Sequence, residues 1–493
     1  MLRKLRISLA FIVFVLMMLL FFDFTGTFHR FFGLLAKVQL MPAILAVNTV
    51  IIIALVLLTL LFGRIYCSVI CPLGVLQDLI SHFSKRGKKR PFNYSKPLTL
   101  LRWTIFAAFA LLLVFAANYA ALIEPYSVFG RIAANIFAPV YKAGNNVLAF
   151  FAEKTNSHAF YTTDVWLKSG ITLGIAAVSL IVVGFMAWKY GRLYCNSICP
   201  VGTVLGLISR FSLFKPIINL EKCTTCGACA RKCKSQCIHP KEHTIDYSRC
   251  VSCFNCLEAC EQDAMKFKFS SNKAPENANR PENKDFSRRS FLSIATAFVA
   301  GSTLKAQEDA VDGGLAAIEK KKRPRRTTTL VPPGAQSLRN LNRHCTACGL
   351  CISACPNNIL CPSNKIEMLM QPEMNYERSF CRPECTECSS VCPTRAIRKL
   401  TKEEKSSLQI GHSVWLRQNC LAVRDEINCE ACEKHCPCGA ISRVPLAADK
   451  PDSVKIPVVD TERCIGCGAC EYYCPARPFA AIYVEGHENH KFI

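Results

Sequence analysis

Cysteine is the residue whose spacing in this chain most directly implies chemistry. The 493-residue sequence contains 31 Cys, and most of them fall into runs close to C-x2-C-x2-C-x3-C. In bacterial two-cluster ferredoxins, the first three Cys of one run and the fourth Cys of its partner run bind one [4Fe–4S] cluster. Soft thiolates suit iron, and paired runs disfavour the alternative of structural four-Cys zinc sites.

Six runs pair in sequence order and predict six [4Fe–4S] clusters. Cys237 is a competing ligand close to Cys233, and Cys361 and Cys438 are left without a role. Crossed ligation assigns the iron ligands as Cys223, Cys226, Cys229 and Cys260; Cys250, Cys253, Cys256 and Cys233; Cys345, Cys348, Cys351 and Cys392; Cys381, Cys385, Cys388 and Cys355; Cys420, Cys429, Cys432 and Cys474; and Cys464, Cys467, Cys470 and Cys436.

A different cysteine motif, GRxYCxxICPxG, occurs twice, within residues 63–81 and 191–209. Residues four apart on a helix share a face, and Pro72 and Pro200 should end the helix before them. Two hairpins related by an axis along the membrane normal would bring the copies together. The alternatives are a redox dithiol pair, a metal site, or cysteines that only pack the hairpins. The candidate residues are Cys67, Cys71, Cys195 and Cys199.

Four long apolar stretches precede residue 195, and about 20 apolar residues are needed to cross a bilayer. They run approximately over Leu5–Phe22, Met41–Phe62, Leu98–Ile123 and Leu167–Trp188. Lys and Arg concentrate before the first stretch, between the second and third, and after the fourth, which predicts a cytoplasmic N-terminus. The predicted fold class is an α-helical membrane domain of four transmembrane helices plus α+β bacterial-type ferredoxin domains, in the bacterial inner membrane.

Composition divides the chain into domains and linkers. A twin-arginine signal is indicated by Ser287-Arg288-Arg289-Ser290-Phe291-Leu292 before a short apolar stretch. The predicted order is a membrane domain (1–215), a cytoplasmic two-cluster ferredoxin (216–270), a polar linker (271–286), the twin-arginine signal or anchor (287–304), a second linker (305–340) and a four-cluster domain (341–493, in halves 341–400 and 410–493). We expect short strands at Ile456–Val459 and Ala481–Val484.

The apolar stretch after the arginine pair is shorter than a membrane-spanning helix and fits an export signal. The four-cluster domain is therefore expected in the periplasm. A basic run at Lys320–Arg326 follows, and we interpret it as a patch resting on anionic lipid headgroups at the outer face.

The formal net charge is +24, which could indicate nucleic acid or a membrane surface as partner. Each [4Fe–4S] cluster with four thiolates carries about −2 when oxidised, so six clusters would remove about half of this charge. We therefore expect the lipid bilayer as a partner, and no nucleic acid.

Two families carry these motifs. Residues 1–270 resemble the NapH-type membrane ferredoxins in the two GRxYCxxICPxG copies and the two-cluster run that follows them. Residues 285–493 resemble the exported ferredoxins NapG and MauM in the SRRSFL segment, in Val331–Ala335 (VPPGA) and in the four unequal cysteine motifs. Fusion of both in one chain departs from the usual arrangement of two separate chains.

The resemblance implies a quinol dehydrogenase that has the quinone pool as a partner and feeds a periplasmic reductase or cytochrome c. Asp23, His29 and Glu124 lie near the outer ends of the first and third apolar stretches, where they could accept protons from a quinol. The alternative function is an electron-donating assembly or regulatory factor for maturation of a metalloenzyme, because its membrane module would look the same.

Overall fold

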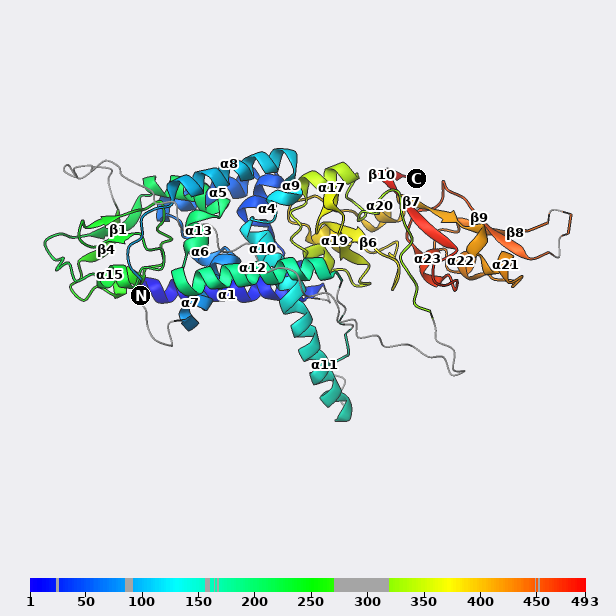
Figure 1. The fold of residues 1–493 in the computed structure, drawn as a ribbon, viewed down its shortest axis with the longest axis horizontal. Coiled ribbons are helices and arrows are strands. Elements are labelled where there is room, and N and C mark those ends of the chain that lie inside the picture. Colours follow the sequence, from blue (N-terminus) through cyan, green and yellow to red (C-terminus); the bar gives the residue numbers. More distant parts are fainter. Residues whose placement is uncertain are drawn as a thin grey trace, which may run out of the picture.

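A computed structural model of the chain describes residues 1–23, 26–84, 92–155, 160–163, 165, 168–269, 319–447, 449–450 and 453–493. The molecule is elongated, with a small ferredoxin region at one end, a helical region in the middle and a larger C-terminal region at the other end (Figure 1). The predicted linker 271–286 and twin-arginine segment 287–304 lie outside the described residues.

The helical region is built on four longer helices: α1 (Leu2–Phe22), α5 (Thr49–Phe62), α8 (Thr99–Phe115) and α12 (Gly170–Tyr190). Two of them, α1 and α12, have 21 residues each and are long and apolar enough to cross a bilayer. At about 1.5 Å per residue, the 14 residues of α5 and the 17 residues of α8 extend only about 21 and 26 Å.

The second and third predicted spans are broken, which the hydropathy pattern did not show. Val47 adopts a left-handed φ of 51°, and the Asn48 side chain caps α5 by accepting a hydrogen bond from Ile51 N (3.3 Å). Asn competes for backbone groups in this way and so favours helix starts. At Ala116, extended backbone ends α8 and precedes the short α9 (Ala117–Ala120).

Apolar side chains point outward from the helical region, and charged side chains point inward. Val114 and Phe185 are 77% and 60% exposed, whereas Arg64 and Arg192 are 0% and 1% exposed. This is the reverse of a protein folded in water. It is the distribution expected where the surrounding solvent is lipid and ionisable residues face the bundle interior.

Each GRxYCxxICPxG copy forms two short helices separated by a break. They are α6 (Tyr66–Val69) and α7 (Pro72–Ser84) in the first copy, and α13 (Leu193–Ser197) and α14 (Pro200–Ile208) in the second. Proline is favoured at the first position of a helix, where no backbone N–H is needed. The two Cys of a copy therefore do not share one helix face as expected, because the second Cys lies at the break.

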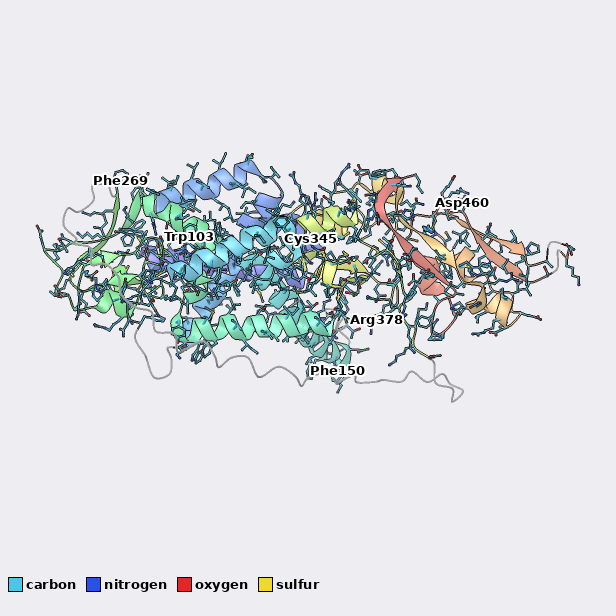
Figure 2. All side chains as sticks on the ribbon, turned by 45° about the horizontal axis from the view of Figure 1, so that its top comes forward. Trp103, Phe150, Phe269, Cys345, Arg378 and Asp460 are labelled. Carbon is cyan, nitrogen blue, oxygen red and sulfur yellow. The ribbon has the colours of Figure 1, made fainter. Side chains whose placement is uncertain are left out.

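Short helices complete the region: α2 (Thr27–Phe32), α3 (Leu34–Lys37), α4 (Leu40–Leu45), α10 (Pro125–Ile132), the π-helix η1 (Ala133–Phe137) and the 3₁₀ turn η2 (Ser209–Phe211). A longer helix, α11 (Ala138–Lys154), projects away from the bundle across its long axis (Figure 1). Figure 2 shows Phe150 on this projecting helix. Several of its apolar side chains, including Val140, Leu148 and Phe151, are exposed.

The small ferredoxin region contains two antiparallel strand pairs and two one-turn helices. They are β1 (Phe214–Ile218) with β4 (Met265–Phe269), β2 (Ile238–His239) with β3 (Thr244–Ile245), α15 (Ala228–Arg231) and α16 (Asn255–Glu258). It is joined to the helical region by backbone and hydroxyl contacts: Leu213 N donates to Leu60 O (2.8 Å), and Ser252 Oγ donates to Phe62 O (2.8 Å).

The C-terminal region has an inner half next to the helices and an outer half beyond it (Figure 1). The inner half holds α17 (Leu338–His344), α18 (Leu350–Ser353), β5 (Leu360–Pro362) paired with β6 (Pro372–Met374), η3 (Ile366–Met368), α19 (Glu387–Val391) and α20 (Lys402–Ser406). The outer half holds β7 (Leu408–Trp415) paired with β10 (Ile482–Phe492), β8 (Ile441–Pro445) paired with β9 (Lys455–Val459), η4 (Arg417–Asn419), α21 (Leu421–Arg424), α22 (Ala431–Lys434) and α23 (Ala469–Tyr473).

Both predicted strands are found, since β9 contains Ile456–Val459 and β10 begins one residue after the predicted start at Ala481. The last part of the predicted linker 305–340 is not a linker but part of the folded C-terminal domain. Val331 and Ala335 are fully buried in the main hydrophobic core, so the C-terminal domain begins before residue 341.

Three of the six basic residues in the run Lys320–Arg326 contact the C-terminal region through their side chains. Arg326 forms a buried, two-hydrogen-bond ion pair with Glu471 (2.6 and 2.7 Å). Lys321 Nζ donates to Glu471 O (2.7 Å) and Tyr472 O (2.8 Å), and Arg323 pairs with Glu373. These contacts hold the segment against the C-terminal domain, whereas Lys320, Lys322 and Arg325 are exposed, and contact of the run with lipid headgroups stays a prediction.

A glycine at the contact between the two GRxYCxxICPxG copies gives a stability prediction. A Cβ on Gly202 would lie 2.1 Å from Cys195 O and 2.7 Å from an Arg64 nitrogen, whereas a Cβ on Gly144 would meet nothing within 4 Å. We expect Gly202→Ala to destabilise the protein by at least about 1–3 kcal/mol because backbone must move. Gly144→Ala, in the middle of α11, should be neutral or stabilise by up to about 1 kcal/mol. Thermal unfolding of both purified variants in detergent measures the difference; equal midpoints would contradict the close approach.

Candidate functional site

The two cysteine runs of the small ferredoxin region exchange their fourth residue, as crossed ligation requires. One cavity is lined by Cys223, Cys226, Cys229 and Cys260. A second cavity is lined by Cys250, Cys253, Cys256 and Cys233, and also by Cys237. Left-handed backbone at Gly227 and Phe254 turns the chain into α15 and α16, which places the third Cys of each run inward.

The C-terminal runs gather in the same crossed way. Cys381, Cys385, Cys388 and Cys355 line one cavity. Cys345, Cys348, Cys351 and Cys392 are close enough to interact electrostatically, as are Cys464, Cys467, Cys470 and Cys436. Cys420, Cys432 and Cys474 share one buried cluster of side chains, with Cys429 beside Cys432.

Among the described residues, no three His, Cys, Asp or Glu side chains converge tightly enough for a single metal ion. A [4Fe–4S] cluster spaces its ligand sulfurs more widely than one ion does, and a cavity between four sulfurs suits that larger group. The cysteine sets of this structure therefore fit [4Fe–4S] clusters and not single metal ions.

The sequence left three Cys without a role, and two of them lie beside predicted ligands. Cys237 Sγ is 3.5 Å from Cys233 Sγ in the second cavity, and Cys438 Sγ is 3.7 Å from Cys436 Sγ. Cys361 is buried in β5, apart from the six sets. In the sequence, the only sign that Cys237 and Cys438 lie near predicted ligands is their short spacing along the chain. Cys237 follows Cys233 by four residues, and Cys438 follows Cys436 by two.

The inner and outer halves of the C-terminal region meet at two cysteines. Cys381 N donates to Cys467 O (2.9 Å), which joins the set containing Cys381 to the set containing Cys467. Ser413 Oγ lies 3.1 Å from Cys470 Sγ, and a hydrogen bond to a cluster sulfur is one means of tuning its potential.

The two GRxYCxxICPxG copies are held together by reciprocal hydrogen bonds. Arg64 Nη2 donates to Cys195 O (2.9 Å), and Arg192 Nη1 donates to Cys67 O (2.8 Å). The same guanidinium groups reach the sulfur of their own copy, at 3.9 Å for Cys67 and 3.7 Å for Cys195. The repeat thus forms one buried unit.

All four thiols of this unit are buried. Cys199 Sγ accepts a hydrogen bond from Gly202 N (3.3 Å), and Gln77 Nε2 lies 3.4 Å from Cys195 Sγ. Cys71 interacts electrostatically with Cys67 and with Cys195. The tertiary structure therefore brings together the residues that the sequence only paired by repetition.

Buried positive charge surrounds these thiols. Asp78 accepts hydrogen bonds from Arg6 (2.9 Å) and Arg192 (2.9 Å), and Lys234 Nζ lies 3.3 Å from it. Arg64 and Arg102 are also buried, and neither forms an ion pair with a residue that the structure describes. One carboxylate therefore faces several cations, and an anionic group at the thiols would balance them.

The three residues predicted to accept quinol protons are all buried at the other end of the helical region. His29 Nδ1 lies 3.1 Å from Asp23 Oδ2, and His29 Nε2 has no partner in the described part of the chain. The Glu124 carboxylate caps α10 by accepting hydrogen bonds from Tyr126 N and Ser127 N. Burial raises the pKa of this carboxyl above its ordinary value.

Tyrosines fill the space between the thiols and Glu124. Tyr194 Oη donates to Ile123 O (2.8 Å), next to Glu124, and Tyr66 Oη donates to Gln39 Oε1 (2.9 Å). Both tyrosines interact electrostatically with the thiols and with Glu124. On the far side of Glu124, Tyr126 contacts Cys348 of the C-terminal region.

The C-terminal region contacts the helical region through a cysteine run. Helix α18 packs on α1 and η1, and α17 packs on α9. A Cβ on Gly130 would lie 2.3 Å from Cys348 O, so backbones touch there. Figure 2 shows Cys345 at this junction, with Phe269 toward one end of the molecule and Asp460 toward the other.

Comparisons with known proteins agree with these sites. A 4Fe–4S binding domain model matches residues 45–91 and 171–220, which include the two GRxYCxxICPxG cysteine pairs. Two 4Fe–4S dicluster domain models match residues 246–359 and 427–477. No solved structure matches the chain.

Curated relatives cover parts of the chain. The electron transport protein YccM of Escherichia coli is 25% identical over 227 residues (45% of this chain and 55% of YccM). The regulatory protein NosR of Stutzerimonas stutzeri is 27% identical over 206 residues (40% and 23%). The methylamine utilization ferredoxin-type protein MauM of Methylobacillus flagellatus is 31% identical over 147 residues (28% and 61%). The chain thus spans less than two thirds of each.

These observations make the chain an iron–sulfur electron-transfer protein that carries [4Fe–4S] clusters.

The buried charge network predicts that replacing its carboxylate by an uncharged amide greatly lowers the stability of the protein. Asp78→Asn leaves Arg6, Arg192 and Lys234 without their shared anion, so we expect a loss of about 3–5 kcal/mol of stability. Glu258→Gln removes the exposed ion pair with Arg3 and should cost at most about 1 kcal/mol. Thermal unfolding in detergent at matched salt compares them. Similar losses would show that the buried network does not stabilise the fold.

Proposed function

We propose that this chain is a membrane-bound quinol dehydrogenase that passes electrons to a periplasmic reductase or cytochrome c. One observation carries the proposal: sulfur sites form a line from the small ferredoxin region, through the helical region, to the tip of the C-terminal region. Arg64 links the first two parts, because it contacts Ser248 O (3.0 Å) beside Cys250 as well as Cys67. Tyr126 and Glu124 link the helical region to Cys348.

The six crossed cysteine sets would each hold one [4Fe–4S] cluster, with the 24 ligands assigned from the sequence. A cluster supplies one-electron chemistry, and the protein fixes the spacing and the surroundings of each one. Gathering of the sulfurs around common cavities supports the assignment.

The helical region would span the inner membrane with α1, α5, α8 and α12. Its outward apolar side chains and inward arginines support this, and Lys and Arg near the small ferredoxin region support a cytoplasmic location for that end. The C-terminal region contacts the opposite end of the helices (Figure 1), which would be periplasmic. Helix α11 crosses the long axis there, as an interfacial amphipathic helix would.

The four buried thiols would carry electrons between the two ends. The surplus of buried arginine charge supports an anionic group close to these thiols, because burying cations without a nearby anion is costly. The match of the 4Fe–4S binding domain model to both copies also supports a redox role. The Asp23–His29 pair and Glu124 would receive the protons released by the quinol.

A second function is favoured by one relative. NosR bears the name of a regulatory protein, so this chain could instead supply electrons for assembly or regulation of a metalloenzyme. Both functions would use the same clusters. Only a quinol dehydrogenase requires sustained turnover with quinol.

Quinol reduction of the purified protein distinguishes them. In detergent or nanodiscs, a naphthoquinol should reduce the clusters, as seen by bleaching of visible absorbance, with about 24 Fe per chain. A periplasmic acceptor should then turn over. Absence of any cluster reduction would exclude quinol dehydrogenase activity.

The same assay tests the thiols. Changing Cys67 and Cys195 to Ser should block electron flow between the two ends while iron content stays at the wild-type level. Cys361→Ser is the matched control, since this buried Cys lies outside the six sets. Normal flow in the double variant would make the four thiols structural.

Protease accessibility tests the orientation. In intact spheroplasts, added protease should digest residues 319–493 and spare residues 216–269. Lysine in place of both Arg288 and Arg289 should protect the C-terminal region by blocking twin-arginine export. A wild-type C-terminal region that is digested only after lysis would place both ferredoxin regions in the cytoplasm.

A further inference from the structure

We propose that a cavity between the helical and C-terminal regions binds the ring of a membrane quinol. The inference rests on the proposed function and specifies where its substrate sits. The cavity is partly open and lies among the ends of α1 and α12, helices α10 and α11, η1 and the α18 segment. Its lining includes Phe22, Arg131, Asn135, Lys168, Thr172 and Gly349.

The lining suits an aromatic ring with two oxygens at its edge. Phe21, Phe22, Pro139 and Val165 supply apolar surface. Phe22 also stacks on Tyr141 (ring centroids 4.8 Å apart), and Tyr141 lies on the exposed helix α11. A quinol could thus enter from the apolar surface that the helices present to lipid. Sites for small organic ligands are commonly apolar with a few placed polar groups.

Two cations, the buried Arg131 and the half-buried Lys168, supply polar groups. Lys168 Nζ donates to Ile352 O (2.8 Å), and Arg131 donates to Ala121 O (2.9 Å) and Leu122 O (3.0 Å). Arg131 Nε has no hydrogen-bond partner in the described part of the chain. Neither cation forms a salt bridge with a described carboxylate. Both can donate to a quinone carbonyl or stabilise negative charge that develops on a quinol oxygen.

The wall of the cavity also bends in an unusual way. The π-helix η1 contributes Ala134 and Asn135 to the lining, and Asn135 Nδ2 donates to Arg131 O (2.9 Å). Single π-turns occur frequently at functional sites because they displace side chains from the regular helical stripe. Here the π-turn places the side-chain amide of Asn135 next to Arg131.

The opposite wall belongs to a cysteine run. Ala347 and Gly349 flank Cys348, and Ile352 follows Cys351. A ring in the cavity would lie next to the backbone that carries two predicted cluster ligands. In the proposed reaction, a quinol loses two electrons, one at a time, to the iron–sulfur clusters. It becomes a quinone, and its two protons pass to water at the outer face.

None of the three proton acceptors inferred from the sequence lines this cavity. Asp23 caps the loop before α2, accepting from Gly26 N (2.9 Å), and Glu124 caps α10. Glu124 interacts electrostatically with Arg131, however, so it stands next to the cavity as a route for protons. The ring site and the proton route are therefore made by different residues.

Photolabelling and binding test the site in the full-length protein in nanodiscs. An azido-naphthoquinone should label peptides that contain residues 131–142 or 347–352. Lys168→Met and Asn135→Leu should each raise the Kd of a naphthoquinone about tenfold, because a hydrogen bond to a charged or polar group is lost. Lys154→Met is the control, since this exposed Lys on α11 does not line the cavity; its Kd and the iron content of all variants should match the wild type.

Two outcomes separate this inference from the proposed function. Labelling confined to other segments, with wild-type Kd in both variants and normal cluster reduction by naphthoquinol, would overturn the site and leave the function intact. Labelling at the cavity with weakened binding in the variants supports the site even if naphthoquinol reduces no cluster, in which case the quinol dehydrogenase function fails.

Discussion

The reciprocal contact between two arginines and two cysteine carbonyls organises the rest of this protein. Each GRxYCxxICPxG copy presents an arginine to the carbonyl of the other copy, so neither arginine is satisfied by its own segment. The contact needs glycines at positions 74 and 202, because a Cβ at either would overlap a cysteine carbonyl of its own copy and the guanidinium that the other copy donates to that carbonyl. It also buries positive charge around four thiols. Packing and electrostatics are thus tied to one interaction.

This constraint explains how a thin helical region separates two ferredoxin regions. The short helices α6, α7, α13 and α14 fill the interior, so α5 and α8 need not run the full length of the bundle. The small ferredoxin region attaches at the arginine end through Ser248 and Lys234. The C-terminal region attaches at the other end, where Gly130 allows its backbone to touch α10. The sulfur sites are therefore connected by packed protein throughout.

The junction with the C-terminal region combines several unusual features in one place. It has an apolar opening, a buried arginine and a half-buried lysine that form no salt bridge with a described carboxylate, a π-turn, and a cysteine run in one wall. The helical region supplies the hydrogen-bond donors, and the C-terminal region supplies the neighbouring cysteines that are predicted to bind iron. Joining both regions in one chain would hold these walls in register, since residues such as Lys168 and Ile352 bond across the junction.

The sequence by itself determined the chemistry, because cysteine spacing is local. It predicted [4Fe–4S] clusters, from the cysteine runs, and two of the strands, whereas the assignment of the six ligand sets stays a prediction. It also predicted apolar helices, but not the breaks at Asn48 and Ala116, since hydropathy does not record backbone conformation. Only the tertiary structure decided that Val331 belongs to the core, that the basic run pairs with Glu471 and Glu373, and that Arg131 and Lys168 share a cavity. Those contacts join residues far apart in the chain, and no local pattern encodes them.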